Sequence, residues 1–335
     1  MTEPTPTPEQ NLPLVTFAVF AFNQEKYIRE AVEGAFSQTY EPLEIILSDD
    51  CSSDRTFEIM QEMAAAYDGP HDVKVRQNEV NQGTLGHVLT VSSHAQGELI
   101  VVAAGDDVSI PDRACTLAEE FQKTGATIIF SQVKGITSET VDQENLTFTC
   151  PFTGRIREFG LGASAAYDTS FFRSIPFPNG AVLHEDVLFA SIAYLAGMEL
   201  TWVKKPLVNY RERTTVLHSS GNLLKNIRLT KAELKLRAHR INFYIKLLQY
   251  CIVNLQSLID IFSKEFSMNA DQIASHLRNR IKHYEVLQRF HKSGIISGLT
   301  RLDGIDRYNR PEIIRVFLGP SFFAVIKGTY VTVKR

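Results

Sequence analysis

Residues 43–50 read LEIILSDD, and residues 98–107 read ELIVVAAGDD. Each stretch is a continuous apolar run, suited to a β-strand, that ends in two adjacent aspartates. A strand buried in a parallel sheet has apolar neighbours on both faces, so it reads as such an unbroken run. Ligands of open α/β sheets bind outside the carboxyl ends of the strands. We therefore predict that Asp49-Asp50 and Asp106-Asp107 lie at the ligand-binding edge of one sheet.

A third acidic pair, Glu185-Asp186, begins a predicted helix. Adjacent carboxylates repel one another unless a cation or a donor-rich ligand shares them. Neither GxxxxGK[ST] nor GxGxxG occurs in the chain, so the two commonest glycine-rich phosphate loops are missing. Mg²⁺ and Mn²⁺ are commonly held by one or two carboxylates together with substrate phosphates. The pairs therefore predict a divalent metal and a phosphorylated ligand; the alternative is that they cap or stabilise helix N-termini.

The spacing of apolar residues predicts alternating strands and helices. Strands are expected at 14–20, 43–47, 73–76, 99–103 and 127–130, separated by helices at 25–37, 54–67 and 83–95 and by one that starts near Pro111. This order is typical of βαβ units in a mostly parallel sheet. The pattern dissolves at about 133–161. It resumes with short segments at 163–167 and 170–174, a helix at 185–196, and strands at 200–203 and 207–210.

The composition is that of an ordinary soluble globular protein, with 44% apolar and 22% charged residues among 335. Residues 1–12 have neither a basic nor an apolar segment, so we expect a disordered leader rather than a signal peptide. The nearly apolar run 12–22 contains Pro13 and is too short to span a bilayer. The four cysteines lack metal-binding spacing, so we expect reduced thiols and a cytoplasmic protein. They are Cys51, Cys115, Cys150 and Cys251.

Charge divides the chain into two predicted regions. Residues 222–335 carry 20 Lys and Arg against 8 Asp and Glu, a net charge of +12, while the remaining residues carry 15 basic and 30 acidic side chains. We assign 13–221 to an α/β domain and 222–335 to a basic extension with helices at 223–262 and 270–290. Such helices can contact a membrane surface, a second subunit, an acceptor or the first domain. Nucleic acid is not an expected partner, because no nucleic-acid-binding motif is present.

Several short segments occur in the order found in one enzyme family. They are Ala21-Phe22-Asn23, Ser37-Gln38-Thr39-Tyr40, LSDDCSSD at 47–54, Asn81-Gln82-Gly83, AGDDVSIPDR at 104–113 and His184-Glu185-Asp186. With these segments, residues 14–220 resemble family 2 glycosyltransferases. The resemblance implies an α/β GT-A fold, in which helices flank a Rossmann-like, mostly parallel sheet. It also implies a UDP-, dTDP- or GDP-sugar donor, a Mn²⁺ or Mg²⁺ cofactor and inversion at the anomeric carbon.

The resemblance implies roles for individual residues. Asp186 would be the general base that deprotonates the acceptor hydroxyl, and Asp107 would bind the metal. His218 is a candidate for a further metal ligand, and Glu185, Arg211 and Arg213 are candidates for contacts with the diphosphate or the acceptor. Phe22 would lie near the base, Asp50 would accept from a ring N–H, and Asp106 would lie at the ribose or sugar. The full set expected at the donor nucleotide is Ala21, Phe22, Asn23, Asp50, Asn81, Gly83 and Asp106.

These residues predict a metal-dependent glycosyltransferase. A glycosyl transition state is oxocarbenium-like and its leaving group is a diphosphate, so a nearby metal and a carboxylate on the opposite face both lower the barrier. The family resemblance also implies that the acceptor is a glycan or lipid-linked glycan in the synthesis of a bacterial surface polysaccharide, such as O-antigen or capsule. The protein would then be cytoplasmic or peripheral on the inner face of the membrane. The alternatives are a nucleotidyltransferase and a non-catalytic nucleotide-sugar-binding or scaffolding protein.

Overall fold

A computed structural model describes residues 12–136, 147–149, 156–158, 160–174, 185–211, 245, 248–249 and 269–293. The chain divides into two compact units. Unit 1 contains 1–150, 154–213 and 260–265, and unit 2 contains 151–153, 214–259 and 266–335. The predicted site residues within the described ranges all belong to unit 1. The boundaries predicted near 12 and 221 stay predictions, because residues 1–11 and 212–244 lie outside the described ranges.

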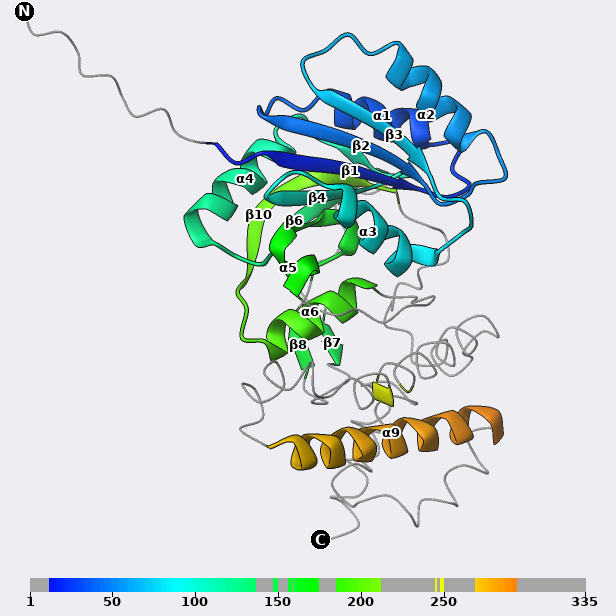
Figure 1. The fold of residues 1–335 in the computed structure, drawn as a ribbon, viewed down its shortest axis with the longest axis vertical. Helices are drawn as coiled ribbons and strands as arrows, with labels where there is room; N and C mark the ends of the chain where they lie inside the picture. Colours follow the sequence, from blue (N-terminus) through cyan, green and yellow to red (C-terminus); the bar gives the residue numbers. More distant parts are fainter. Residues whose placement is uncertain are drawn as a thin grey trace, which may run out of the picture. The chain divides into compact units, whose positions relative to one another are not determined.

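Unit 1 begins with four parallel strands joined by helices (Figure 1). The order is β1 (Val15–Ala21), α1 (Ile28–Phe36), β2 (Leu43–Asp49), α2 (Thr56–Ala65), β3 (Asp72–Gln77), α3 (Gly83–His94) and β4 (Leu99–Ala104). β1 lies between β2 and β4, and Ala18 pairs with both Ile46 and Val102. Because the strands are parallel, their carboxyl ends meet at one edge of the sheet, and the first two acidic pairs stand there.

The second half of the sheet is mixed. It contains β5 (Val108–Ser109), β6 (Ile128–Gly135), β9 (Ala165–Asp168) and β10 (Leu200–Tyr210), and the full order is β3-β2-β1-β4-β9-β6-β10-β5. β9 is antiparallel to β4 and to β6, and β5 is antiparallel to β10. The parallel direction is therefore confirmed for β1–β4 and for the β6–β10 pair, with β9 inserted between the two sets.

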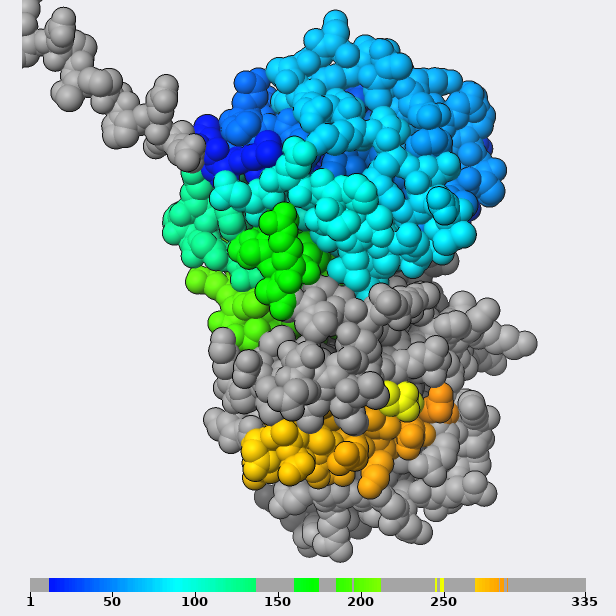
Figure 2. All heavy atoms as spheres, viewed as in Figure 1, coloured from blue at the N-terminus to red at the C-terminus, as the bar shows by residue number. Residues whose placement is uncertain are grey.

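The remaining elements of unit 1 surround this sheet. They are α4 (Arg113–Thr124), the β7 (Thr147–Thr149) and β8 (Ile156–Glu158) hairpin, the 3₁₀ helix η1 (Gly162–Ser164), α5 (Thr169–Ser174) and α6 (Glu185–Leu195). In the space-filling view, α3 in cyan and α5 in green form neighbouring parts of one face, and the two helices are in contact (Figure 2). The candidate site residues of the first four strands lie on or beside the loops that follow β1, β2, β3 and β4.

Helices cover both faces of the sheet, which explains the unbroken apolar runs. Phe17 and Ile45 pack in a core with α1, α2 and α4 on one face. Ala18 and Ile46 pack against Val91 of α3 on the other face (Figure 1). Successive side chains of a strand point to opposite faces, so neighbouring residues must both be apolar in such a sheet.

Two predictions for the second half are wrong. The strands expected at 200–203 and 207–210 are one strand, β10, whose pairing with β6 shifts register on each side of Pro206. Proline has no N–H for the ladder, so such an irregularity is the usual way to include it. The region 133–161, expected to be irregular, contains the end of β6 and the β7–β8 hairpin.

Helix α9 (Ala270–Ser293) of unit 2 confirms the helix expected at 270–290. The N–H of Asn269 donates to Gln272 Oε1, and the N–H of Gln272 donates to Asn269 Oδ1, each at 3.0 Å. These two bonds form a reciprocal cap at the start of the helix. Ile273 and Leu277 are buried, one turn apart. The helix expected at 223–262 lies almost wholly outside the described residues. In the described part of the chain, no helix has the length and apolarity that a bilayer crossing requires.

Candidate functional site

Hydrogen bonds lock the β1–α1 turn to the β2–α2 loop. Asn23 has a positive φ of 53°, and its N–H donates to Ser52 Oγ at 2.8 Å. The amide oxygen of Asn23 accepts from the N–H of Ser53 at 2.8 Å. Asparagine tolerates this left-handed conformation better than most residues. The turn places Phe22 at the edge of the sheet with 46% of its surface exposed, whereas Ala21 is buried.

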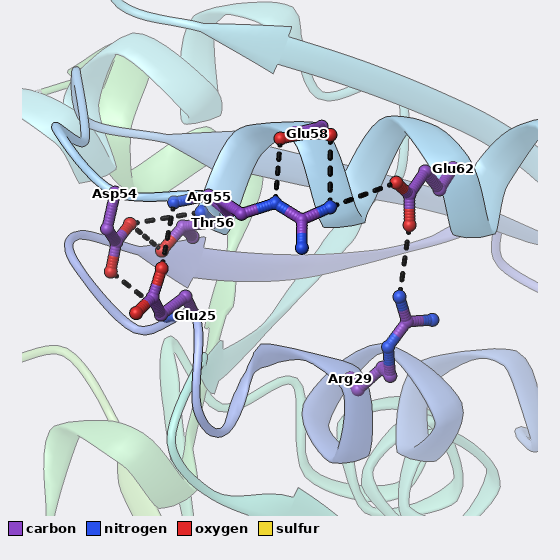
Figure 3. Close-up of polar contacts among 7 residues, drawn as sticks. All are labelled: Glu25, Arg29, Asp54, Arg55, Thr56, Glu58 and Glu62. Carbon is purple, nitrogen blue, oxygen red and sulfur yellow. Dashed lines mark hydrogen bonds and ion pairs between the residues drawn. The ribbon is translucent and has the colours of Figure 1, made fainter.

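A second set of polar contacts joins the starts of α1 and α2 (Figure 3). Asp54 Oδ2 accepts from the N–H of Glu25 at 3.1 Å, and Glu25 Oε2 accepts from the N–H of Arg55 at 3.2 Å. Arg55 also pairs with Glu58 at 3.0 Å and with Glu62 at 3.4 Å. Such exposed ion pairs contribute little to stability, because solvent screens them. The bonds to backbone N–H groups therefore do more to order the loop that carries the first acidic pair.

Asp50 is buried, and both of its carboxylate oxygens accept hydrogen bonds from the protein. Oδ1 accepts from Asn78 Nδ2 at 2.7 Å and from the N–H of Gln82 at 2.9 Å, and Oδ2 accepts from the N–H of Gly83 at 2.9 Å. Gln82 and Gly83 begin α3, so Asp50 stabilises the N-terminus of that helix. A carboxylate has about four acceptor positions, so about one remains for a ligand. The predicted contact with a nucleobase stays a prediction.

Asn81 and Gly83 shape the turn before α3. Gly83 has a φ of 70°, which glycine adopts without steric cost. Its N–H also lies 3.1 Å from Asn81 Oδ1. The turn therefore presents the N–H groups of Gln82 and Gly83 to Asp50, and it joins the β3–α3 loop to the same edge as Phe22.

A buried polar network behind Asp50 was not predicted. Arg76 donates from Nη2 to Asn78 Oδ1 at 2.5 Å and from Nη1 to Ser48 Oγ at 2.6 Å. Ser48 Oγ lies 2.6 Å from His87 Nε2. Burial lowers the pKa of His87 to about 4, so the ring is neutral at pH 7. The residues come from β2, β3 and α3, so no short sequence motif contains them.

Arg211, which follows β10, joins the Asp106-Asp107 segment to α1. Its N–H donates to Asp107 Oδ1 at 2.7 Å, and its Nε donates to the carbonyl oxygen of Asp106 at 3.0 Å. Its guanidinium pairs with Glu30 at 2.9 Å and lies over the ring of Tyr27, 4.5 Å from the centroid. The structure thus brings a residue predicted at the diphosphate beside the residue predicted at the metal, although 104 positions separate them.

Gly105 precedes the second acidic pair at a position where family members with a DxD motif often have an acid. A Cβ at this position would lie 3.0 Å from Ala21 Cβ and 3.1 Å from Ile28 Cδ1, and closer still to Gln24 Oε1. A side chain would therefore push the β1–α1 turn away from β4. The glycine allows the two predicted donor-binding segments to approach each other.

The third acidic pair begins α6 beside η1. Asp186 Oδ1 accepts from the N–H of Val187 at 2.7 Å, and Oδ2 accepts from the N–H of Gly162 at 3.3 Å. A Cβ on Gly162 would lie 3.1 Å from Asp186 Cβ and 3.5 Å from Glu185 Oε1. Burial, together with the neighbouring charge of Asp186, raises the pKa of Glu185 to about 8. At pH 7 this pair therefore includes one carboxyl group that holds its proton.

Asp107, with the carboxylate of Asp106 beside it in the chain, is the candidate metal ligand within the described residues. No three His, Cys, Asp or Glu side chains of that part of the chain form a group that could hold a metal. Two adjacent carboxylates still fit Mg²⁺ or Mn²⁺, because these ions take their remaining ligands from phosphates and water. His218 and Arg213 lie outside the described residues, so their predicted roles stay predictions.

The sequence model of the family described as glycosyl transferase family 2 matches residues 16–177. This range runs from the second residue of β1 to beyond β9 and includes the first two acidic pairs. Residues 16–177 are a family 2 glycosyltransferase domain. This assignment confirms the family resemblance that the short segments carry.

Relatives of this domain include a candidate glycosyltransferase and a succinoglycan biosynthesis protein. EpsH of Bacillus subtilis, named a candidate glycosyltransferase, is 30% identical over 220 residues, or 59% of this chain and 61% of EpsH. The succinoglycan biosynthesis protein ExoO of Rhizobium meliloti is 33% identical over 117 residues, or 35% of this chain and 32% of ExoO. The chain spans between 25% and 61% of the length of the first curated relatives that it matches.

Solved structures confirm the GT-A fold. TarS 1–349 of S. aureus in complex with UDP-GlcNAc has a TM-score of 0.52 at 19% identity, over 90% of this chain and 78% of that chain. GalNAc-T7 with UDP, GalNAc and Mn²⁺ has a TM-score of 0.55 at 16% identity, over 80% of this chain and 59% of that chain. At these identities the likeness concerns the fold alone.

Proposed function

We propose that the protein is an inverting, metal-dependent glycosyltransferase that moves a sugar from a nucleoside diphosphate to a hydroxyl of a glycan or lipid-linked glycan. One observation carries the proposal. The carboxyl ends of β1, β2 and β4 lie at one edge of the sheet, within residues matched by the glycosyl transferase family 2 model, and Arg211 bonds to the segment that follows β4. The segments that leave these strands carry Phe22, Asp50 and Asp107.

The donor would bind across the ends of these strands. Phe22 offers an exposed aromatic face to the base, and Asp50 keeps about one acceptor position for a ring N–H. Ala21, Asn23, Asn81 and Gly83 supply the backbone path around this position. The complex of TarS with UDP-GlcNAc supports a nucleotide sugar as the ligand of such a fold.

Asp107 would hold the divalent metal, with Asp106 beside it at the ribose or sugar. Bound Mn²⁺ or Mg²⁺ supplies Lewis-acid stabilisation of the diphosphate leaving group. The guanidinium of Arg211 donates to the carbonyl oxygen of Asp106 and adds positive charge of a shape that suits phosphate oxygens. The presence of Mn²⁺ in the GalNAc-T7 complex supports a metal for this fold.

Asp186 would accept the proton of the acceptor hydroxyl. Its carboxylate is oriented by the N–H groups of Gly162 and Val187, so the group is held ready for one geometry. Glu185, with its raised pKa, would hold a proton at pH 7 and donate a hydrogen bond to the acceptor. Neighbouring carboxyl groups with different protonation states are a recurring way to divide acid and base roles.

The proposed setting is surface polysaccharide synthesis, which the match to ExoO supports. A lipid-linked acceptor would place the protein at the inner face of the cytoplasmic membrane, and the basic region 222–335 would then contact the membrane or a second subunit. The net charge of +12 in this region is the observation that motivates this part of the proposal.

The proposal is tested by the thermal stability of the full chain with UDP, dTDP or GDP in the presence of Mn²⁺, Mg²⁺ or EDTA. A nucleotide at 100 times its dissociation constant adds about 2.7 kcal/mol of stability. We expect one nucleotide type to stabilise the protein, and only when metal is present. Release of that nucleotide from its sugar in the presence of acceptor then measures transfer.

Two variants make this test specific. Asp107→Asn should remove the metal-dependent part of the stabilisation, while Asp72→Asn, an exposed change at the other end of the sheet, should keep it. If no nucleotide stabilises the wild-type protein in the presence of metal, the proposed function is wrong.

A further inference from the structure

Arg113, the first residue of α4, is fully buried although it carries a charge. Its Nη1 donates to Ser109 Oγ at 2.9 Å, and its guanidinium lies 5.8 Å from the ring centroid of Phe17. Its Nε has no hydrogen-bond partner among the described residues. Burying a cation with an unbonded N–H is costly, and an apolar side chain of similar size would avoid that cost. The contacts of Arg113 must therefore provide something that an apolar side chain cannot.

One nitrogen of Arg113 bridges two segments of the site. Its Nη2 donates to the carbonyl oxygen of Val102 at 2.7 Å and to that of Ala163 at 2.9 Å. Val102 belongs to β4, the strand that leads into Asp106-Asp107. Ala163 belongs to η1 and follows Gly162, whose N–H donates to Asp186. Beside the pairing of β4 with β9, this side chain thus gives a second link between the segment of the second acidic pair and that of the third.

The charge of Arg113 also acts on this path. Burial lowers the pKa of Arg113 to about 9, and the negative charge of Asp107 opposes that shift. The side chain is therefore still a cation at pH 7, close enough to Asp107 for their charges to interact. A guanidinium presents its donors in a rigid planar fork, which holds several acceptors at set angles, whereas a lysine presents one point charge.

We propose that Arg113 is a positioning residue that holds the η1–Asp186 segment against the β4–Asp107 segment and so sets the distance between acceptor base and donor. The inference rests on the proposed function for the roles of Asp107 and Asp186. Arg113 touches neither substrate, and it acts through the carbonyl groups of Val102 and Ala163. Its loss should leave the donor site on β1 and β2 intact and misplace the base.

The decisive variants are Arg113→Met and Arg113→Lys in the full chain. The probe is nucleoside diphosphate release from UDP-GlcNAc, dTDP-glucose or GDP-mannose, whichever the wild type uses, with Mn²⁺. A misplacement of 1 Å can lower a rate by about 10²-fold, so we expect kcat of Arg113→Met to fall at least 30-fold. KM for the donor should change less than about threefold, since misplacing the base does not weaken donor binding. Arg113→Lys keeps the charge and should recover part of kcat.

Leu117→Ala is the matched control for stability. Leu117 lies in α4, one turn after Arg113, and is fully buried, but it makes none of these hydrogen bonds. The Leu117→Ala substitution should destabilise the protein. It should leave kcat of the folded fraction within about threefold of wild type, because kcat depends on the geometry of the site. Gly162→Ala tests the contact between η1 and Asp186. The added Cβ would press on Asp186, so kcat should fall while KM for the donor stays unchanged.

Hydrogen exchange gives a readout that does not depend on activity. In Arg113→Met the amides at 162–164 and 187 should exchange at least tenfold faster than in Leu117→Ala at equal global stability. A kcat within threefold of wild type in Arg113→Met would overturn the inference, and so would parallel changes in kcat and KM. If the wild type uses no donor, the proposed function is wrong, and the role of Arg113 is then judged by hydrogen exchange alone. Unchanged exchange at 162–164 in Arg113→Met would show that Arg113 does not hold the η1 segment in place.

Discussion

The Asp49-Asp50 pair after β2 and the Glu185-Asp186 pair at the start of α6 are accommodated in opposite ways. Asp49 accepts from the N–H of Ser52 at 2.8 Å and from Gln77 Nε2 at 2.9 Å, and Asp50 accepts from three donors. The protein thus supplies hydrogen-bond donors to both acids of the first pair. In the third pair, Glu185 instead has its pKa raised to about 8 by burial and by Asp186.

This difference shows that two adjacent acids do not have one structural meaning. Hydrogen bonds from N–H groups favour an ionised carboxylate, whereas burial and a like charge disfavour it. The first pair therefore stabilises the loops that would hold the proposed donor site, and the third pair is under electrostatic strain at the proposed acceptor side. The contrast between Asp49-Asp50, which supports the fold, and Glu185-Asp186, which is proposed to act in the reaction, can be tested by three substitutions.

The largest expected effect is on turnover in Asp186→Asn. Removing a general base lowers the rate by about 10²–10⁴-fold, so transfer should fall by that factor. Binding of the metal–nucleotide complex should stay within about threefold of wild type, because a base contributes to the transition state and not to donor binding. Turnover by single-turnover kinetics and binding by calorimetry measure the two effects. Wild-type turnover in this variant would show that Asp186 is not the base.

Asp50→Asn should have a smaller effect, and on stability. The new NH₂ group would face at least one of the donors Asn78, Gln82 and Gly83, and an unsatisfied buried donor costs about 1–3 kcal/mol. Denaturant unfolding should show that loss, together with weaker nucleotide binding. Asp72→Asn, an exposed change at the first residue of β3, is the control and should alter stability by less than about 0.5 kcal/mol. Equal stability of the two variants would contradict the supporting role of the first pair.

Glu185→Gln should show the smallest effect, visible as a change in pH dependence. The pKa of Glu185 lies at about 8 in the folded protein and at 4.5 as the ordinary value, so the folded state binds more protons between these pH values. Stability should therefore be full below about pH 4.5 and fall as the pH rises to about 8. Gln stays neutral, so the variant should be more stable than wild type at pH 8 and equal to it at pH 4.

Unfolding at a series of pH values checks this last prediction. Glu199→Gln changes an exposed carboxylate between α6 and β10 and should keep the wild-type pH dependence. If the curves of Glu185→Gln and wild type run parallel, Glu185 is not strained in the folded protein, and the contrast between the two pairs is lost.

Apolar periodicity was sufficient to predict β1–β4, their helices and the edge at which the first two acidic pairs meet. This works because burial on both faces makes a strand continuously apolar, and because parallel strands must end together. Periodicity did not reveal that β9 is antiparallel between β4 and β6, since a short buried strand reads the same in either direction. It also split β10 at Pro206, where the strand continues through a shift of register.

The sequence by itself therefore determined the family, the order of the first elements and the positions of the candidate acids. Only the tertiary structure decided what each acid faces. The donors of Asp50 lie 28 to 33 positions away, the donor of Asp107 lies 104 positions away, and Arg113 reaches a carbonyl 50 positions away. Local composition reports burial and periodicity, but the charge state and orientation of a carboxylate depend on partners that only the folded sheet brings together.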